Sequence, residues 1–178
     1  VTPGHEFVGE VVALGEGAAE KHGLQIGDWA VSEQIVPCWE CRFCRQGDYW
    51  MCQRHDIYGF IKDRAEGSWA EYMVFPAGSV NHRIPKDLTI EEAALVEPMA
   101  CAVHAVQRGE IQLGDTVVIA GMGPIGLGMV QVAKQKGPAR VIALDMKPKR
   151  LELARRLGAD LAIDIRERDA IERVMDLT

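Results

Sequence analysis

A strand, a glycine-rich turn, a helix and a second strand follow one another between residues 116 and 145, and this order strongly constrains the fold. Residues 116–120 are a short β-branched run, which is typical of a strand buried on both faces. The sequence Gly-Met-Gly-Pro-Ile-Gly follows, then apolar residues at helical spacing, then a strand-like run that ends at Asp145. In this context the G-x-G-x-x-G pattern predicts a dinucleotide site on a parallel sheet.

Each position of the turn has a physical task. Gly121 allows the tight turn, Gly123 lets the backbone approach a pyrophosphate, and Gly126 lets helix and strand pack closely. Pro124 and Ile125 complete the turn, and the helix N-terminus offers unpaired N–H groups to phosphates. The alternative is an ordinary glycine-rich turn between a strand and a helix.

Asp145 lies about twenty residues beyond the last glycine, where an acidic residue accepts hydrogen bonds from the adenine ribose. A 2′-phosphate would lie against this carboxylate, so the expected cofactor is NAD rather than NADP. Lys147, Lys149 and Arg150 could assist a 2′-phosphate, but Asp145 argues against that, and a solvated helix face explains them. We keep Lys147 and Arg150 as candidate cofactor-binding residues.

Four of the five cysteines crowd into a lobe at residues 37–55 with the spacing Cys38-x2-Cys41-x2-Cys44-x7-Cys52. Four thiolates at this spacing can converge on one tetrahedral zinc ion, and a lobe with little apolar content needs such a crosslink. Because four thiolates leave no open coordination position, this zinc is expected to be structural. An iron–sulfur site usually closes with a three-residue gap and a proline, which this lobe lacks. Unmetallated cysteines are the other alternative.

Composition excludes some partners. The chain has 178 residues and a formal net charge of −6, so neither nucleic acid nor an anionic membrane is an expected partner. No apolar run is long enough to span a bilayer and no signal peptide is recognisable, so we expect a cytoplasmic protein. In such a protein clustered cysteines point to metal rather than to disulfides.

The first half of the chain has strand patterns, and the second half alternates strands with helices. Strands are expected at residues 7–14, 29–36 and 69–75. Thr89, with Glu92 at the capping-box position, predicts a short helix that ends near Leu95. Pro98 favours the start of the next helix, which is expected to end near Arg108. After the nucleotide unit we expect a helix at 148–157, a strand at 161–165 and a helix near 167–176.

Three further residues are candidates for chemistry. A histidine next to a glutamate, as in Gly4-His5-Glu6, is unremarkable alone. Glu97 stands before Pro98, where it could simply be an acidic group favoured by the helix dipole.

In combination, these motifs resemble the zinc-containing medium-chain alcohol dehydrogenases. The motifs are G-H-E-x-x-G-x-V from Gly4, the cysteine lobe, Glu-Pro before a helix, and the G-x-G-P-I-G turn. The resemblance covers essentially the whole chain and implies an α/β protein. It implies a GroES-like β-barrel catalytic domain at residues 1–97, without its N-terminal part. It also implies a Rossmann domain with a doubly wound parallel sheet at residues 98–178, without its C-terminal part.

By this resemblance His5 is a ligand of a catalytic zinc ion, and the family's first ligand, a cysteine, is expected upstream of the first residue. Many simple alcohol dehydrogenases have a cysteine where this chain has Glu97. With a glutamate at this position, the chain resembles the polyol dehydrogenase branch of the family. In that branch Glu6 can bind zinc directly, while Glu97 reaches it through water or by exchange. One thiolate and one carboxylate would neutralise the zinc dication, so Glu6 and Glu97 are expected to compete for it.

The resemblance implies a zinc-dependent enzyme that transfers hydride from a secondary alcohol of a polyol to NAD. Sorbitol, threitol and erythritol are the expected kinds of substrate. It also implies a substrate pocket near Tyr58 and Phe60, and a homodimer or homotetramer. An L-threonine 3-dehydrogenase is one alternative, although such proteins often carry a histidine shortly before the cysteine lobe, and residues 27–37 contain none. A non-catalytic NAD-binding fragment is the alternative of another class.

Overall fold

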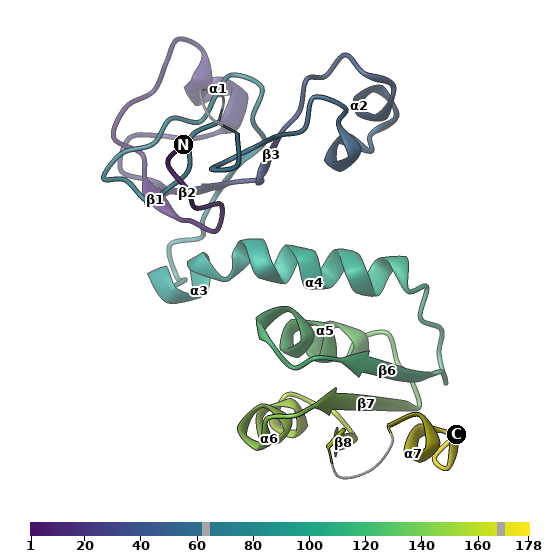
Figure 1. The fold of residues 1–178 in the computed structure, drawn as a ribbon. Helices are drawn as coiled ribbons and strands as arrows, with labels where there is room; N and C mark the ends of the chain where they lie inside the picture. Colours follow the sequence, from purple (N-terminus) through teal and green to yellow (C-terminus); the bar gives the residue numbers. More distant parts are fainter. Residues whose placement is uncertain (62–64, 167–169) are drawn as a thin grey trace. The chain divides into compact units, whose positions relative to one another are not determined.

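The computed structural model describes residues 1–61, 65–166 and 170–178. The chain forms two compact units, Val1–Glu97 and Pro98–Thr178 (Figure 1). The first unit is built from short antiparallel strands, and the second contains a parallel sheet with helices. The α/β fold class expected from the sequence is therefore confirmed.

The first unit contains two small sheets, one with the strand order β1-β2-β5 and the other pairing β3 with β4. Both sheets are antiparallel. In chain order the elements are β1 (Gly9–Glu10), α1 (Ala18–His22), β2 (Trp29–Ser32), β3 (Ile35–Val36), α2 (Arg42–Gln46), the 3-10 helix η1 (Tyr49–Met51), β4 (Asp56–Ile57), β5 (Asn81–Arg83) and α3 (Ile90–Ala94).

The single strand predicted for residues 29–36 is wrong, because the chain changes partners midway. The N–H of Glu33 donates to the carbonyl of Val80 at 2.9 Å, which continues the pairing of β2 with β5. The next residue, Gln34, accepts instead from the N–H of Tyr58 at 3.1 Å, on the side of β4. The run is therefore divided into β2 and β3.

The other two predicted strands of this unit are also shortened or lost. Residues 7–14 form a strand only at β1. Residues 69–75 form no strand in the part of the chain that the structure describes. Trp69, Tyr72 and Val74 are largely exposed, whereas Phe75 packs against the core. Of this run only Met73 and Phe75 pack against the core, so the alternation predicts neither burial along the whole run nor backbone pairing.

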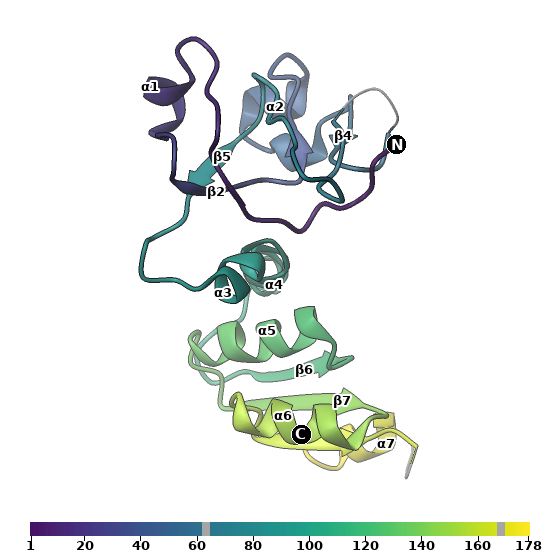
Figure 2. The same ribbon diagram turned by 90° about the vertical axis from the view of Figure 1, so that its left-hand side faces the viewer.

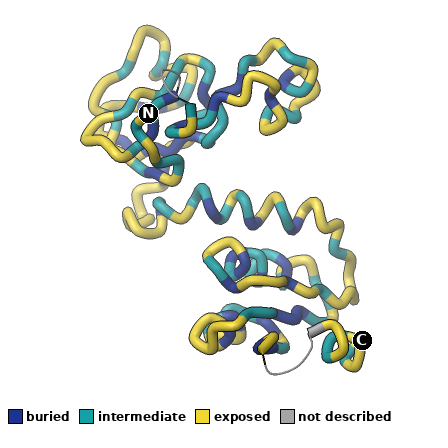
Figure 3. Tube along the Cα trace, in the orientation of Figure 1, coloured by how far each residue is buried: buried dark blue, intermediate teal, exposed yellow. Residues whose placement is uncertain are grey.

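Buried stretches occur in both units (Figure 3). One core cluster of the first unit gathers around Tyr58, which is fully buried. Phe7, Val36 and Ala65 pack with it. The ring of Tyr58 lies edge-on to that of Phe7 at a centroid distance of 5.4 Å, and its hydroxyl lies 3.2 Å from the Ser32 hydroxyl oxygen. These contacts join the segment that follows His5 and Glu6 to β2 and to the residue that follows β4.

The second unit has a three-stranded parallel sheet with the order β6-β7-β8. Figure 2 shows α5 running alongside β6 and α6 alongside β7, as expected of a Rossmann unit. The helices and strands from the link onwards are α4 (Val96–Arg108), β6 (Thr116–Ala120), α5 (Pro124–Lys134), β7 (Arg140–Asp145), α6 (Pro148–Arg156), β8 (Leu161–Asp164) and α7 (Ala170–Met175).

The elements of the second unit lie close to their predicted positions. Helix α4 begins at Val96, two residues earlier than predicted, and Pro98 is tolerated because a first-turn N–H has no helical partner to lose. The first three positions of the predicted last helix, residues 167–169, lie outside the described residues. Among the described residues, no helix combines the length and apolar character needed to cross a membrane.

One face of the parallel sheet supplies the core of the second unit. Ile119, Val141 and Ala162 come from successive strands and pack with residues of α4, α5 and α6. On the opposite face Ile142 is fully buried, but its neighbour Val118 on β6 is 42% exposed. In the part of the chain that the structure describes, β6 is an edge strand and only Ile119 of residues 116–120 is buried, so the burial on both faces predicted for this run is not seen there.

The predicted capping box at α3 is confirmed. The N–H of Glu92 donates to the Thr89 hydroxyl at 3.2 Å, and the Glu92 carboxylate accepts from the Thr89 N–H at 2.8 Å. Replacing Thr89 with alanine should lower the free energy of unfolding by about 1 kcal/mol, because the cap is lost. Chemical denaturation measures this change. Thr89→Ser keeps the hydroxyl and should stay near the parent, and equal loss in both variants would contradict the cap.

Candidate functional site

His5, Glu6 and Glu97 lie together in the first unit. Each offers one ligand atom, and these atoms all lie within 4.8 Å of one another. A zinc ion with bonds of roughly 2.0–2.2 Å to nitrogen and oxygen needs ligand atoms about 3.4 Å apart, so small side-chain rotations would close this group on one ion. A neutral imidazole beside carboxylates is a donor set suited to zinc.

Different parts of the chain position these ligands. His5 and Glu6 follow Gly4, whose φ of +103° is a backbone conformation that favours glycine. Glu97 lies in the first turn of α4, where the helix dipole favours a carboxylate. His5 and Glu97 are half-buried, whereas Glu6 is exposed. The group is therefore open to solvent and to a ligand on the Glu6 side.

The two aromatic residues expected in a substrate pocket differ in their surroundings. The ring of Phe60 lies edge-on to the imidazole of His5 at a centroid distance of 5.3 Å, and Phe60 is 61% exposed. Tyr58 has no exposed surface. Its burial argues against contact with a substrate, and we keep only Phe60 as a candidate.

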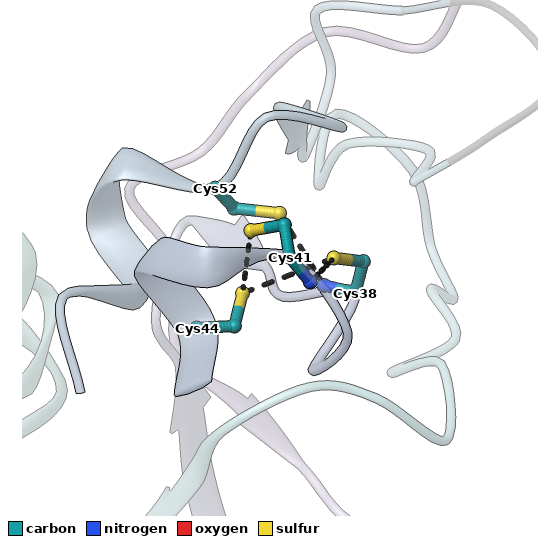
Figure 4. A group of neighbouring side chains, drawn as sticks. All are labelled: Cys38, Cys41, Cys44 and Cys52. Carbon is teal, nitrogen blue, oxygen red and sulfur yellow. Dashed lines mark hydrogen bonds between the residues drawn. The ribbon is translucent and has the colours of Figure 1, made fainter. Parts of the chain in front are cut away.

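The four clustered cysteines face one another around the N-terminal end of α2 (Figure 4). The Sγ of Cys44 lies 3.9 Å from the Sγ of Cys38 and 3.6 Å from that of Cys41. Four sulfurs in tetrahedral contact with one zinc at about 2.3 Å would be about 3.8 Å apart. All four ligand atoms, that of Cys52 included, lie within 4.8 Å of one another, so the group fits a zinc ion.

Backbone N–H groups point at the sulfurs. The N–H of Cys38 donates to the Sγ of Cys52 at 3.4 Å, and the N–H of Cys41 donates to the Sγ of Cys38 at 3.3 Å. The N–H groups of Cys44 and then Gln53 lower the pKa of the Cys41 thiol to about 6. Burial raises the pKa of the Cys44 thiol to about 12. Such N–H donors stabilise thiolates, the form that binds metal.

The cysteine lobe is tied to the strands by contacts that the sequence did not reveal. The Glu33 carboxylate accepts from the Tyr49 hydroxyl at 2.9 Å and lies 3.1 Å from Nε2 of His82. The indole N–H of Trp39 donates to the carbonyl of Gly78 at 2.8 Å. No local sequence pattern predicts the contact between Glu33 and His82, because these residues lie in distant segments of the chain.

The glycine turn of the second unit brings two stretches of backbone into close contact. A Cβ atom added at Gly126 would lie 1.8 Å from the carbonyl oxygen of Gly121, far inside any allowed contact. Gly121 itself has a φ of +88°. Pro124 and Ile125 start α5, and Gly123 precedes them in an extended conformation. This is the strand-turn-helix geometry that presents backbone N–H groups to a phosphate.

Asp145 ends β7 and reaches the turn. One carboxylate oxygen accepts from the N–H of Met122 at 2.7 Å, and the other accepts from the N–H of Lys147 at 2.8 Å. The Met122 N–H contributes most to holding the pKa of Asp145 below its usual value. The guanidinium of Arg150 lies 3.9 Å from the same carboxylate. Each carboxylate oxygen has two lone pairs, so Asp145 can still accept from ribose hydroxyls.

Two family models match the chain. The model of the alcohol dehydrogenase GroES-like domain matches residues 1–86, and that of the zinc-binding dehydrogenases matches residues 124–178. The chain is 56% identical over its whole length to an erythritol/L-threitol dehydrogenase from Mycolicibacterium smegmatis. The chain belongs to the zinc-containing medium-chain alcohol dehydrogenase family. The resemblance noted in the sequence is therefore confirmed.

Other members of this family are also similar. A sorbitol dehydrogenase from Bacillus subtilis is 37% identical over 98% of the chain, and an L-threonine 3-dehydrogenase from Pyrococcus horikoshii is 41% identical over 98% of it. The chain covers 49%, 48% and 48% of the erythritol/L-threitol, sorbitol and threonine enzymes, so it spans about half the length of these curated relatives.

Solved structures of the family share the fold. Galactitol-1-phosphate dehydrogenase from Escherichia coli superposes with a TM-score of 0.86 at 32% identity, and covers 98% of this chain and 49% of its own. A zinc-binding dehydrogenase from Sinorhizobium meliloti, bound to NADP, gives a TM-score of 0.87 at 32% identity. That match covers 97% of this chain and 48% of its own.

The convergence of the four cysteines predicts that each of them is needed to hold one zinc ion. Cys44→Ser in the full-length protein should remove about one equivalent of zinc per subunit and lower the melting temperature, because the metal crosslinks the lobe. Metal analysis and thermal unfolding measure both effects. Cys101→Ser is the matched control, since Cys101 lies outside the cluster, and it should retain the metal. Full zinc content in Cys44→Ser would contradict the assignment.

Proposed function

We propose that the protein containing this chain is a zinc- and NAD-dependent polyol dehydrogenase, which oxidises a secondary alcohol to a ketone. The observation that carries this proposal is the approach of His5, Glu6 and Glu97 within 4.8 Å. The 56% identity to an erythritol/L-threitol dehydrogenase supports the polyol as substrate class. The expected homodimer or homotetramer remains a prediction.

His5, Glu6 and Glu97 have different roles around the proposed metal. A zinc ion, when bound, lowers the pKa of an alcohol, and NAD accepts the hydride. His5 binds as a neutral donor and leaves the charge of the ion intact. With one thiolate as a further ligand, one carboxylate completes charge neutrality, and a second would weaken the site as a Lewis acid. Glu6 and Glu97 would therefore compete for the ion, and the carboxylate that is not bound to it could hold a proton or a water.

Phe60 provides an apolar boundary beside the reacting carbon. Its edge contact with His5 restricts the imidazole ring and keeps water from one side of the site. A polyol binds with its hydroxyl groups toward the carboxylates and its carbon chain against the exposed part of this ring. Both carboxylates also offer hydrogen-bond acceptors to a second hydroxyl, which suits a vicinal diol better than a simple alcohol.

L-threonine is a second candidate substrate. Threonine dehydrogenases are as similar to the chain as some sorbitol dehydrogenases, with 41% identity in each case. Threonine carries a secondary alcohol but also a carboxylate and an ammonium group. Two carboxylates beside the metal would attract its ammonium group and repel its carboxylate, so charge alone does not select it, and the higher identity to an erythritol/L-threitol dehydrogenase favours a polyol.

We predict that the full-length enzyme reduces NAD with four- to six-carbon polyols and not with L-threonine. Glu97→Ala should lower polyol turnover by roughly 10-fold or more while NAD affinity stays unchanged, because Glu97 acts on the metal and its water. Glu97→Cys should retain zinc, since thiolate is also a good ligand, and shift preference away from polyols. Zinc content, NAD affinity and turnover are measured for each variant.

Glu92→Ala is the matched control for Glu97→Ala, because Glu92 caps α3 and lies outside the candidate metal group. This variant should keep full turnover. If Glu97→Ala also kept full polyol turnover, Glu97 would be only an acidic group at a helix start. The argument for the polyol branch would then lose its main support.

Asp145 supports NAD as the cofactor. Its carboxylate is ionised at neutral pH, and hydrogen bonds that lower its pKa reinforce this charge, so it would repel a 2′-phosphate. We predict a preference for NAD over NADP of at least about 10-fold, which corresponds to about 1.4 kcal/mol. Asp145→Ser should narrow this ratio. Steady-state kinetics with both cofactors measure it.

Arg150→Ala is the companion variant, because Arg150 is a cation close to Asp145. Removing the guanidinium should lower the activity with NADP below that of the parent enzyme and leave the activity with NAD nearly unchanged. Equal turnover with both cofactors in the parent enzyme would mean that Lys147 or Arg150 rescues the phosphate, and the preference argued from Asp145 would be wrong.

A further inference from the structure

The segment that leads into His5 lies in a narrow slot between two other stretches of backbone. A Cβ atom added at Gly67 would lie 2.3 Å from the carbonyl oxygen of Pro3 and 2.5 Å from that of Gly4. One added at Gly59 would lie 2.7 Å from the backbone nitrogen of Gly4. Real Cβ contacts are essentially never shorter than 3.0 Å, so both walls of the slot require glycine.

Hydrogen bonds hold the segment in this slot. The N–H of Gly67 donates to the carbonyl of Thr2 at 2.7 Å. The next two N–H groups, those of Ser68 and Trp69, donate to the carbonyls of Gly4 at 3.1 Å and Pro3 at 2.9 Å. Three successive N–H groups therefore donate to the carbonyls of three successive residues. These bonds fix the position and orientation of the backbone that precedes His5 and Glu6.

Side chains add to this attachment. The carboxylate of Glu66 accepts from the N–H of Thr2 at 2.5 Å. On the opposite wall, Phe60 follows Gly59 directly and lies edge-on to His5. The slot thus ends at the imidazole of the candidate metal ligand.

We infer that Gly59 and Gly67 are positioning residues for the catalytic metal, which they influence by fixing the backbone before His5 and Glu6. This inference rests on the proposed metal site. Glu97 comes from a separate element, α4, so the three ligands converge only if the segment at residues 2–6 is held in place. A Cβ atom in the slot would push His5 and Glu6 away from Glu97, and a zinc site tolerates only small displacements.

Gly67→Ala is the sharper test, because Gly67 does not have a positive φ and the substitution therefore adds only bulk. In the full-length protein it should weaken zinc binding at the His5 site by roughly 10- to 100-fold, as is typical when the support of a ligand is lost. Titration with a chromophoric zinc chelator measures the affinity of each zinc. The zinc of the four cysteines should stay bound in this variant.

Gly15→Ala is the matched control. Gly15 lies in the same unit, has no atom within 4 Å of the added Cβ position and does not have a positive φ. Both zinc affinities should match those of the parent. If Gly67→Ala does not fold, Glu66→Ala carries the test, because it removes the acceptor of the Thr2 N–H without adding bulk and should weaken the same zinc by roughly 2- to 10-fold.

The outcomes separate this inference from the proposed function. A parent protein that binds only the zinc removed by Cys44→Ser would overturn the catalytic metal site itself. A parent with two zinc ions and a Gly67→Ala or Glu66→Ala variant with unchanged affinity for both would overturn the positioning role and leave the proposed function standing.

Discussion

Close approach of backbone to backbone is the constraint on which both halves of this chain depend. At Gly126 the first turn of α5 lies against the carbonyl of Gly121, and at Gly67 the chain lies against Pro3. In each case a single methyl group would exceed the available space. Glycine is therefore required at these positions mainly because it lacks a Cβ atom, and less because its backbone is flexible. The candidate cofactor turn and the candidate metal ligands are both fixed by such contacts.

The two candidate metal centres represent opposite solutions to metal binding. The cysteine group takes all its ligands from one short lobe, receives backbone N–H donors, and has no open position. The group around His5 takes its ligands from distant segments, and Glu6 is exposed. A closed site built locally suits a structural role, whereas an open site assembled across the fold suits exchange of ligands during a reaction.

The predictions from the sequence were most accurate for features that depend on residues close together in the chain. The β-branched run of β6, the glycine turn and Pro124 placed the nucleotide unit almost residue by residue, and the spacing of the cysteines predicted their convergence. The metal ligands in the first unit were named only through the family resemblance, since no local signal connects His5 with Glu97. The strand at 29–36 was misjudged because a change of pairing partner is a tertiary event. The close contact of Gly67 with Pro3 is likewise tertiary, so no local pattern distinguishes Gly67 from other glycines.

The hydrogen bond from Met122 to Asp145 has a consequence for the evolution of cofactor use. The carboxylate that we propose discriminates between NAD and NADP also holds the turn on which either dinucleotide would rest. A substitution that accommodates the extra phosphate therefore also loosens the loop that both cofactors share. Coenzyme switching in such a protein passes through variants that are poor with both molecules, unless the new side chain at this position still accepts the Met122 N–H.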